Sequence, residues 1–132
     1  MRKMKIDQFK AKYAFNERRE FLFDELERFI KKVDEFLSPY LLAVYGSYIT
    51  NKPAPGDIDV ILHGFVKQEK LLDWAPGTLQ CQCYIHVMSD ITSYTLYEKK
   101  LKDISVIISD LCNTEENKAE NFNISSYVEI LI

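Results

Sequence analysis

Two aspartates open an apolar segment of this 132-residue chain, and their spacing predicts chemistry. Asp57 and Asp59 flank a single residue at the start of the run "DIDVILH". In a β-strand, residues i and i+2 point to the same face, about 6.5–7 Å apart along the chain. Two carboxylates so placed repel each other unless a cation lies between them, and hard oxygen ligands suit Mg²⁺ or Mn²⁺. The spacing predicts a divalent metal site on the open face of the strand, turned away from the core.

A Gly-Ser pair ends the preceding apolar run and predicts a phosphate-binding turn. Gly46 permits unusual backbone dihedral angles and the close approach of a ligand. Ser47 adds a hydroxyl, and the backbone amides that follow can point at a phosphate. A phosphate held here, beside a metal at the two aspartates, would make one site for phosphoryl or nucleotidyl transfer. The alternative is an ordinary turn at Gly46-Ser47 and aspartates that only cap surface loops.

The combined pattern resembles the signature of the DNA polymerase beta-like nucleotidyltransferase superfamily. Gly46-Ser47 is followed by nine residues and then by Asp57-Ile58-Asp59 at a strand start. The stretch "GSYITNKPAPGDIDV" is most similar to small bacterial and phage members, which include the minimal nucleotidyltransferases of antitoxins and phage-defence loci. The resemblance implies a nucleoside triphosphate at Gly46 and Ser47 and Mg²⁺ (or Mn²⁺) at Asp57 and Asp59. It also implies transfer of a nucleotidyl group to a hydroxyl of a protein or an RNA.

The sequence departs from the family pattern at the third carboxylate, which the family carries on a later strand as a base. The alternating run Thr78–Met88 predicts that strand. Its polar face carries Gln80, Gln82, Tyr84 and His86. None of these is acidic, and Asp90 lies beyond the predicted strand. A histidine can accept a proton near neutral pH, which makes His86 the candidate base. The alternative is a histidine that only packs on the sheet.

Two further groups of residues have a chemical and a plain interpretation. Lys52 stands in the loop where many minimal family members carry an arginine, so it is a candidate phosphate contact; the alternative is a solvated lysine. The spacing Cys81-x-Cys83-x-x-His86 suggests zinc, but on a strand the two cysteines face one side and His86 the other. We therefore expect reduced thiols rather than a zinc site.

The apolar pattern predicts the elements that position these residues. A helix is predicted from the N-cap Asn16 to a stop at Pro39, with apolar residues at i, i+3, i+4 and i+7. Strands are predicted at Leu41–Tyr45, Asp57–His63, Thr78–Met88 and 124–132. Shorter helices are predicted at residues 6–13, Gln68–Trp74 and 90–112, and a loop at 113–123. This order predicts an α/β fold, a mixed sheet with helices packed on one face.

The length fits one domain, with amino-terminal helices in residues 1–40 and the sheet and motif in residues 41–132. The net charge of −3 argues against a general nucleic-acid binder, and the small Lys/Arg excess in residues 1–36 is interpreted as a solvated helix face. Neither a signal peptide nor a membrane span is predicted, so we expect a cytoplasmic protein. The missing third acid leaves a second hypothesis open: a catalytically degenerate fold that binds a toxin or acts in phage defence.

Overall fold

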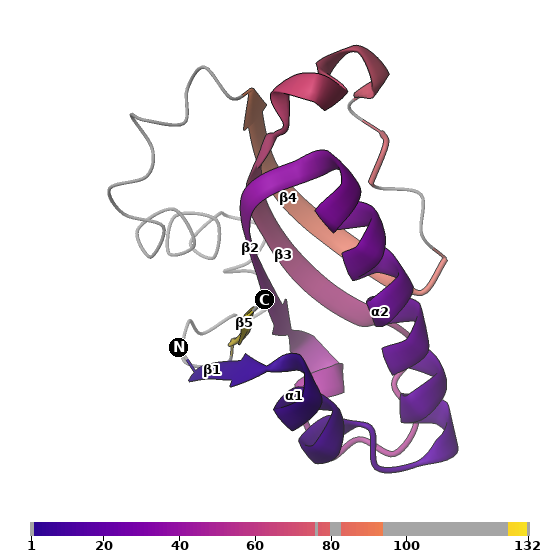
Figure 1. Cartoon of the computed structure of the whole chain (residues 1–132). Coiled ribbons are helices and arrows are strands. Elements are labelled where there is room, and N and C mark those ends of the chain that lie inside the picture. The colour runs from indigo at the N-terminus through magenta and orange to yellow at the C-terminus, as the bar shows by residue number, and fades with distance from the viewer. Residues whose placement is uncertain (1, 76, 80–82, 94–126, 132) are drawn as a thin grey trace, which may run out of the picture.

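The computed structural model describes residues 2–75, 77–79, 83–93 and 127–131. Its five-stranded sheet has the order β1-β5-β2-β3-β4 (Figure 1). β2 runs antiparallel to β3 and β5, whereas β3 is parallel to β4 and β1 to β5. The predicted α/β class with a mixed sheet is thus confirmed. The strands are β1 (Arg2–Lys5), β2 (Leu37–Tyr45), β3 (Ile58–Val66), β4 (Ile85–Ser93) and β5 (Val128–Leu131); the helices are α1 (Ile6–Tyr13) and α2 (Glu17–Phe36) and the 3₁₀ helices η1 (Gly46–Ile49) and η2 (Gln68–Asp73).

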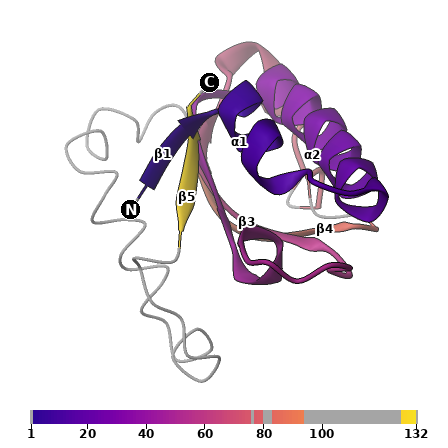
Figure 2. The ribbon, with the colours of Figure 1, turned by 90° about the horizontal axis from the view of Figure 1, so that it is seen from below.

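Helices α1 and α2 lie on the same side of the sheet (Figure 2). The Asn16 side chain caps α2 by accepting a hydrogen bond from the Arg19 amide at 2.9 Å, which satisfies one free donor of the first turn. The apolar stripe of α2 packs on the sheet, and burial of each such side chain contributes about 1.5–3 kcal/mol. These residues are Leu22, Phe23, Leu26, Phe29 and Val33. The predicted helix, its cap and its apolar face are confirmed.

The opposite face of the sheet is also buried over its middle. An apolar cluster on this face is formed by Leu41, Ala43, Tyr45, Ile61 and Tyr127. The prediction that this face is open was therefore wrong for the centre of the sheet. Residues of odd number in β3 point to this face, because Ile58, Val60 and Leu62 belong to the helix-side core. Asp59 lies on the same face at the start of the strand, where it is 23% exposed.

Several predicted boundaries were wrong. α2 ends at Phe36 because Leu37 already has an extended backbone (φ −117°, ψ 141°), so Pro39 lies inside β2 instead of stopping the helix. β3 begins at Ile58 and leaves Asp57 just before the strand. β1 was not predicted, and with the start of β2 it brings part of residues 1–40 into the sheet.

β4 differs most from its prediction. It begins at Ile85 rather than Thr78, and the predicted helix at 90–112 is contradicted at residues 90–93, which belong to β4. Predictions for residues 80–82, 94–126 and 132 lie outside the described residues. The short helix expected after β3 is confirmed as η2, and the predicted last strand as β5. None of the helices in the described ranges has the length and apolar character that a membrane span requires.

Candidate functional site

The antiparallel pairing of β2 and β3 brings the two halves of the motif together. Tyr45, the last residue of β2, pairs with Asp59, so Gly46 turns away from the strand directly beside the Asp59 carboxylate. The φ angle of Gly46 is +78°, and a Cβ placed on it would lie 2.7 Å from Asp59 Oδ2. Both the left-handed backbone and the close approach require glycine here. Gly46 and Asp59, which twelve residues separate in the sequence, are thus in direct contact in the fold.

The parallel pairing of β3 and β4 adds His86 to the other side of the same carboxylate. Asp59 and His86 are register partners, and His86 Nδ1 lies 3.3 Å from Asp59 Oδ1. The His86 side chain is 78% exposed, so solvent reaches the imidazole. The Asp59 carboxylate therefore has one oxygen toward Gly46 and the other toward a group that can carry a proton.

The remaining candidates lie on the connection between β2 and β3. Ser47 is the second residue of η1 and is half-buried, and its carbonyl accepts hydrogen bonds from the amide of Thr50 at 3.2 Å and from its Oγ1 at 2.6 Å. Asp57 is half-buried and immediately precedes β3. Lys52 is exposed, and its backbone amide donates to Thr50 Oγ1 at 3.2 Å. The structure thus brings Gly46, Asp59 and His86 into one cluster and places Ser47 and Asp57 one and two residues along the chain from it.

The beginning of α2 holds this connection through its backbone carbonyls. Asn16 Nδ2 donates to the Pro53 carbonyl at 2.7 Å. Arg18 Nε and Nη2 donate to the carbonyls of Pro55 at 3.1 Å and Gly56 at 3.0 Å. These bonds reach the residues just before Asp57, so the first turn of the helix positions the start of β3.

Arg19 makes the densest set of contacts to the same connection. Its guanidinium donates to the carbonyls of Tyr13 (3.0 Å), Tyr48 (2.6 Å) and Thr50 (2.6 Å), and twice to that of Lys52 (2.8 and 3.0 Å). Arg19 is 0% exposed, and this burial lowers the pKa of its guanidinium. The interpretation of the amino-terminal basic residues as a solvated helix face was wrong for this residue. Helical spacing is the signal that could have found it, because Arg19 lies three, four and seven residues before Leu22, Phe23 and Leu26, on the buried face of the helix.

The site has few protein groups for a metal. In the part of the chain that the structure describes, no three His, Cys, Asp or Glu side chains are grouped to hold one. Mg²⁺ is usually held by one or two carboxylates together with phosphate oxygens of a substrate, and it keeps several waters. Asp59, with Asp57 two residues earlier and an approach left free of a side chain by Gly46, fits that pattern. The donor set suits a metal that arrives with a nucleotide rather than a resident one.

Of the glutamines, cysteines and Asp90 considered around the predicted third strand, Cys83 and Asp90 belong to the described residues. Gln80, Gln82 and Cys81 lie outside the described residues. Cys83 is an exposed free thiol before β4 begins. Asp90, predicted to lie beyond the strand, belongs to β4 and pairs with His63 rather than with Asp59. β4 therefore carries His86, and not an acid, at the position that pairs with Asp59.

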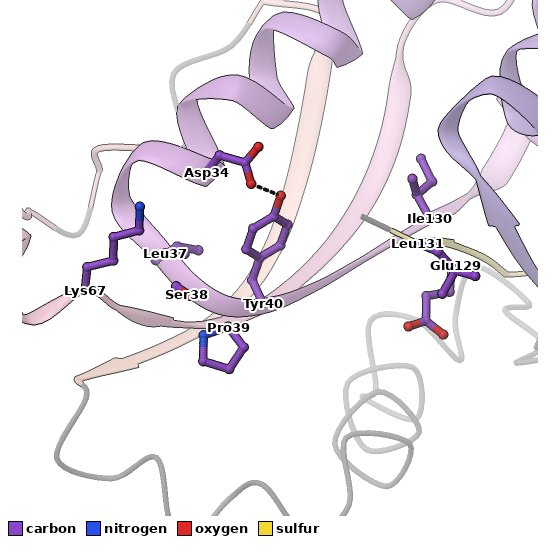
Figure 3. A pocket seen from close by; sticks show the side chains of 9 residues that line it. All are labelled: Asp34, Leu37, Ser38, Pro39, Tyr40, Lys67, Glu129, Ile130 and Leu131. Carbon is purple, nitrogen blue, oxygen red and sulfur yellow. Dashed lines mark hydrogen bonds between the residues drawn. The ribbon is translucent and has the colours of Figure 1, made fainter.

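A separate cavity lies at the opposite end of β2. It has a volume of about 450 Å³, and its walls include Asp34, Ser38, Tyr40, Lys67 and Glu129. Tyr40 donates a hydrogen bond to Asp34, and Glu129 lies across from this pair (Figure 3). Burial and the bond to Asp34 raise the pKa of the Tyr40 phenol. The cavity shares no residue with the cluster at Gly46, so it belongs to a different part of the molecule.

Comparison with known families yields one match. A model for a family of unknown function, DUF6932, matches residues 2–128. No curated protein and no solved structure matches the chain.

Proposed function

The chain belongs to DUF6932, a family of unknown function, and we propose from its own site that it is a nucleotidyltransferase. It binds a nucleoside triphosphate with Mg²⁺ or Mn²⁺ and transfers a nucleotidyl group to a hydroxyl of a protein or an RNA. The observation that carries the proposal is the 2.7 Å approach of a Cβ on Gly46 to Asp59 Oδ2. Because position 46 carries no side chain beside this carboxylate, a phosphate and its metal can approach the main chain there.

The proposed roles follow from the position of each residue. The Gly46-Ser47 backbone and the Ser47 hydroxyl bind phosphate oxygens, because the glycine lets the phosphate approach the main chain. Asp59 and Asp57 would hold the divalent ion, which offsets the negative charge that develops during transfer. Lys52 is a further candidate for a phosphate contact, from the exposed part of the same loop.

The transfer balances without any further reactant. The acceptor hydroxyl oxygen forms a bond to the α-phosphorus, and the bond from that phosphorus to the bridging oxygen breaks, which releases pyrophosphate. The hydroxyl proton goes to a base, and His86 is the candidate because its exposed ring can be reached by an acceptor. Asp59, 3.3 Å from Nδ1, orients the imidazole so that Nε2 faces outward.

Isothermal titration with each nucleoside triphosphate and Mg²⁺ tests the proposal. Wild-type protein should bind at least one triphosphate, and Asp57→Asn with Asp59→Asn should abolish binding while preserving side-chain size. The control is Glu69→Gln with Asp73→Asn, which also removes two negative charges, but from η2. This variant should bind the triphosphate as the wild type does. Equal binding by the Asp57 and Asp59 double variant would exclude the site.

A second function is favoured by one observation. His86 stands where an acid would face Asp59, and on this alternative the fold has lost catalysis and acts as an antitoxin-like or phage-defence interaction module. This alternative predicts that the wild type binds no triphosphate, or binds one without turnover. Release of pyrophosphate that disappears in Asp59→Asn would exclude it.

A further inference from the structure

We propose that Arg19 is a positioning residue for this site. Its guanidinium holds the turn that follows Gly46 in the conformation that keeps Gly46 against Asp59. The inference rests on the proposed nucleotide-binding function and assigns no chemical step to Arg19 itself. Its basis is the burial of the guanidinium among the carbonyl groups of the turn.

The charge of Arg19 stays buried only because the turn surrounds it. Arg19 is 0% exposed, and no ion pair joins it to a carboxylate among the described residues. A buried charge is costly unless hydrogen bonds satisfy it. The donors of a guanidinium point in fixed directions in one plane, so the carbonyls of Tyr48, Thr50 and Lys52 must keep their places. The conformation of the turn and the burial of the arginine are therefore coupled.

A second contact ties the same two segments in the reverse direction. Tyr48 Oη donates to the Arg19 carbonyl at 2.9 Å, while the Tyr48 carbonyl accepts from Arg19 Nη1. The Tyr48 ring is buried and stacks on Phe9 of α1, with 5.9 Å between ring centroids. Only Ser47 separates Tyr48 from Gly46, so a turn fixed at Tyr48 leaves Gly46 little freedom to move away from Asp59.

Arg19→Lys is the direct test, because it keeps the charge and replaces the planar fork by a compact ammonium. The dissociation constant for triphosphate with Mg²⁺ should rise about tenfold or more, as expected when several hydrogen bonds are lost. Amide hydrogen exchange of residues 46–52 should become faster. Arg28→Lys is the matched control, because Arg28 lies exposed on the same helix and pairs only with Glu25 among the described residues; it should change neither quantity.

Stability and positioning are separated by a third variant. Val33→Ala truncates a fully buried side chain of α2 and should lower the melting temperature without changing the dissociation constant or the exchange of residues 46–52. If Arg19→Lys does not fold, Tyr48→Phe keeps the ring, removes one hydrogen bond and should raise the dissociation constant about threefold.

Two results would overturn the inference. One is a wild-type dissociation constant in Arg19→Lys (or in Tyr48→Phe, should only that variant fold). The other is a rise in the dissociation constant of Val33→Ala that equals the rise in Arg19→Lys, when both variants have lost the same amount in melting temperature. If the wild type binds no nucleotide, the proposed function fails, and the exchange of residues 46–52 alone decides whether Arg19 holds the turn.

Discussion

Gly46 and Asp59 lie in contact although twelve residues separate them in the chain: a Cβ on Gly46 would stand 2.7 Å from Asp59 Oδ2. The contact depends on the register that pairs Tyr45 with Asp59. It also depends on the left-handed backbone of Gly46, with φ +78°. An alanine at this position would be strained in its backbone, and its Cβ would collide with the Asp59 carboxylate.

Gly46→Ala should lower the free energy of unfolding by about 1–3 kcal/mol, because the left-handed conformation is strained for alanine and the carboxylate must move. It should also abolish triphosphate binding. Urea unfolding and titration measure the two effects. Gly56→Ala is the matched control, because a Cβ there meets nothing within 4 Å, and it should leave both quantities close to wild type.

His86→Gln should separate chemistry from structure. The His86 side chain is 78% exposed, so its pair with Asp59 adds little stability, and the free energy of unfolding should change by less than about 0.5 kcal/mol. Loss of a general base should lower the transfer rate about 10²-fold or more, with an almost unchanged dissociation constant for triphosphate. An unchanged transfer rate, measured as pyrophosphate release, would show that another group takes the proton.

Asn16 combines two roles that one substitution can separate. Its Oδ1 caps α2, and its Nδ2 donates to the Pro53 carbonyl. Asn16→Ala should lower the free energy of unfolding by about 1–2 kcal/mol because both are lost. Asn16→Asp keeps the cap but not the amide donor, so it should recover part of the loss. Equal values for the two variants would mean that the bond to Pro53 carries the whole effect.

Tyr40 should make stability sensitive to alkaline pH. Burial and the hydrogen bond to Asp34 raise the pKa of its phenol above the ordinary value of 10.0. Below about pH 10 the phenol keeps its proton in both the folded and the unfolded state, so Tyr40 makes its full contribution to the free energy of unfolding. Above about pH 10 only the unfolded state ionises readily, and the free energy of unfolding falls as pH rises.

Urea unfolding of Tyr40→Phe between about pH 8 and 11 measures this contribution, since phenylalanine cannot ionise and the decline above pH 10 should become less steep. Tyr84→Phe, which removes a phenol outside the cavity lining, is the control and should retain the wild-type slope. An unaltered slope in Tyr40→Phe would contradict the prediction.

Local chemistry and periodicity were sufficient for much of the fold. The α2 stripe follows helical spacing, Asn16 is a favoured cap, and the apolar runs around the motif are short enough to be strands. Boundaries were less predictable, because Leu37 joins β2 through its pairing with Val66 of β3 and not through its own preference, and Pro39 lies in the irregular stretch between Leu37 and Tyr40. The same holds for β1, whose charged residues become a strand by pairing with β5.

The sequence by itself determined the class of fold and the residues that could do chemistry at Gly46, Ser47, Asp57 and Asp59. Tertiary structure alone decided which of them meet, because contact depends on strand register, and a shift of one residue would turn Asp59 to the opposite face. It also decided that Arg19 is buried against the turn after Gly46. Helical spacing places Arg19 on the buried face of α2. It does not identify the partners, which are backbone carbonyls about thirty residues away that any sequence would supply.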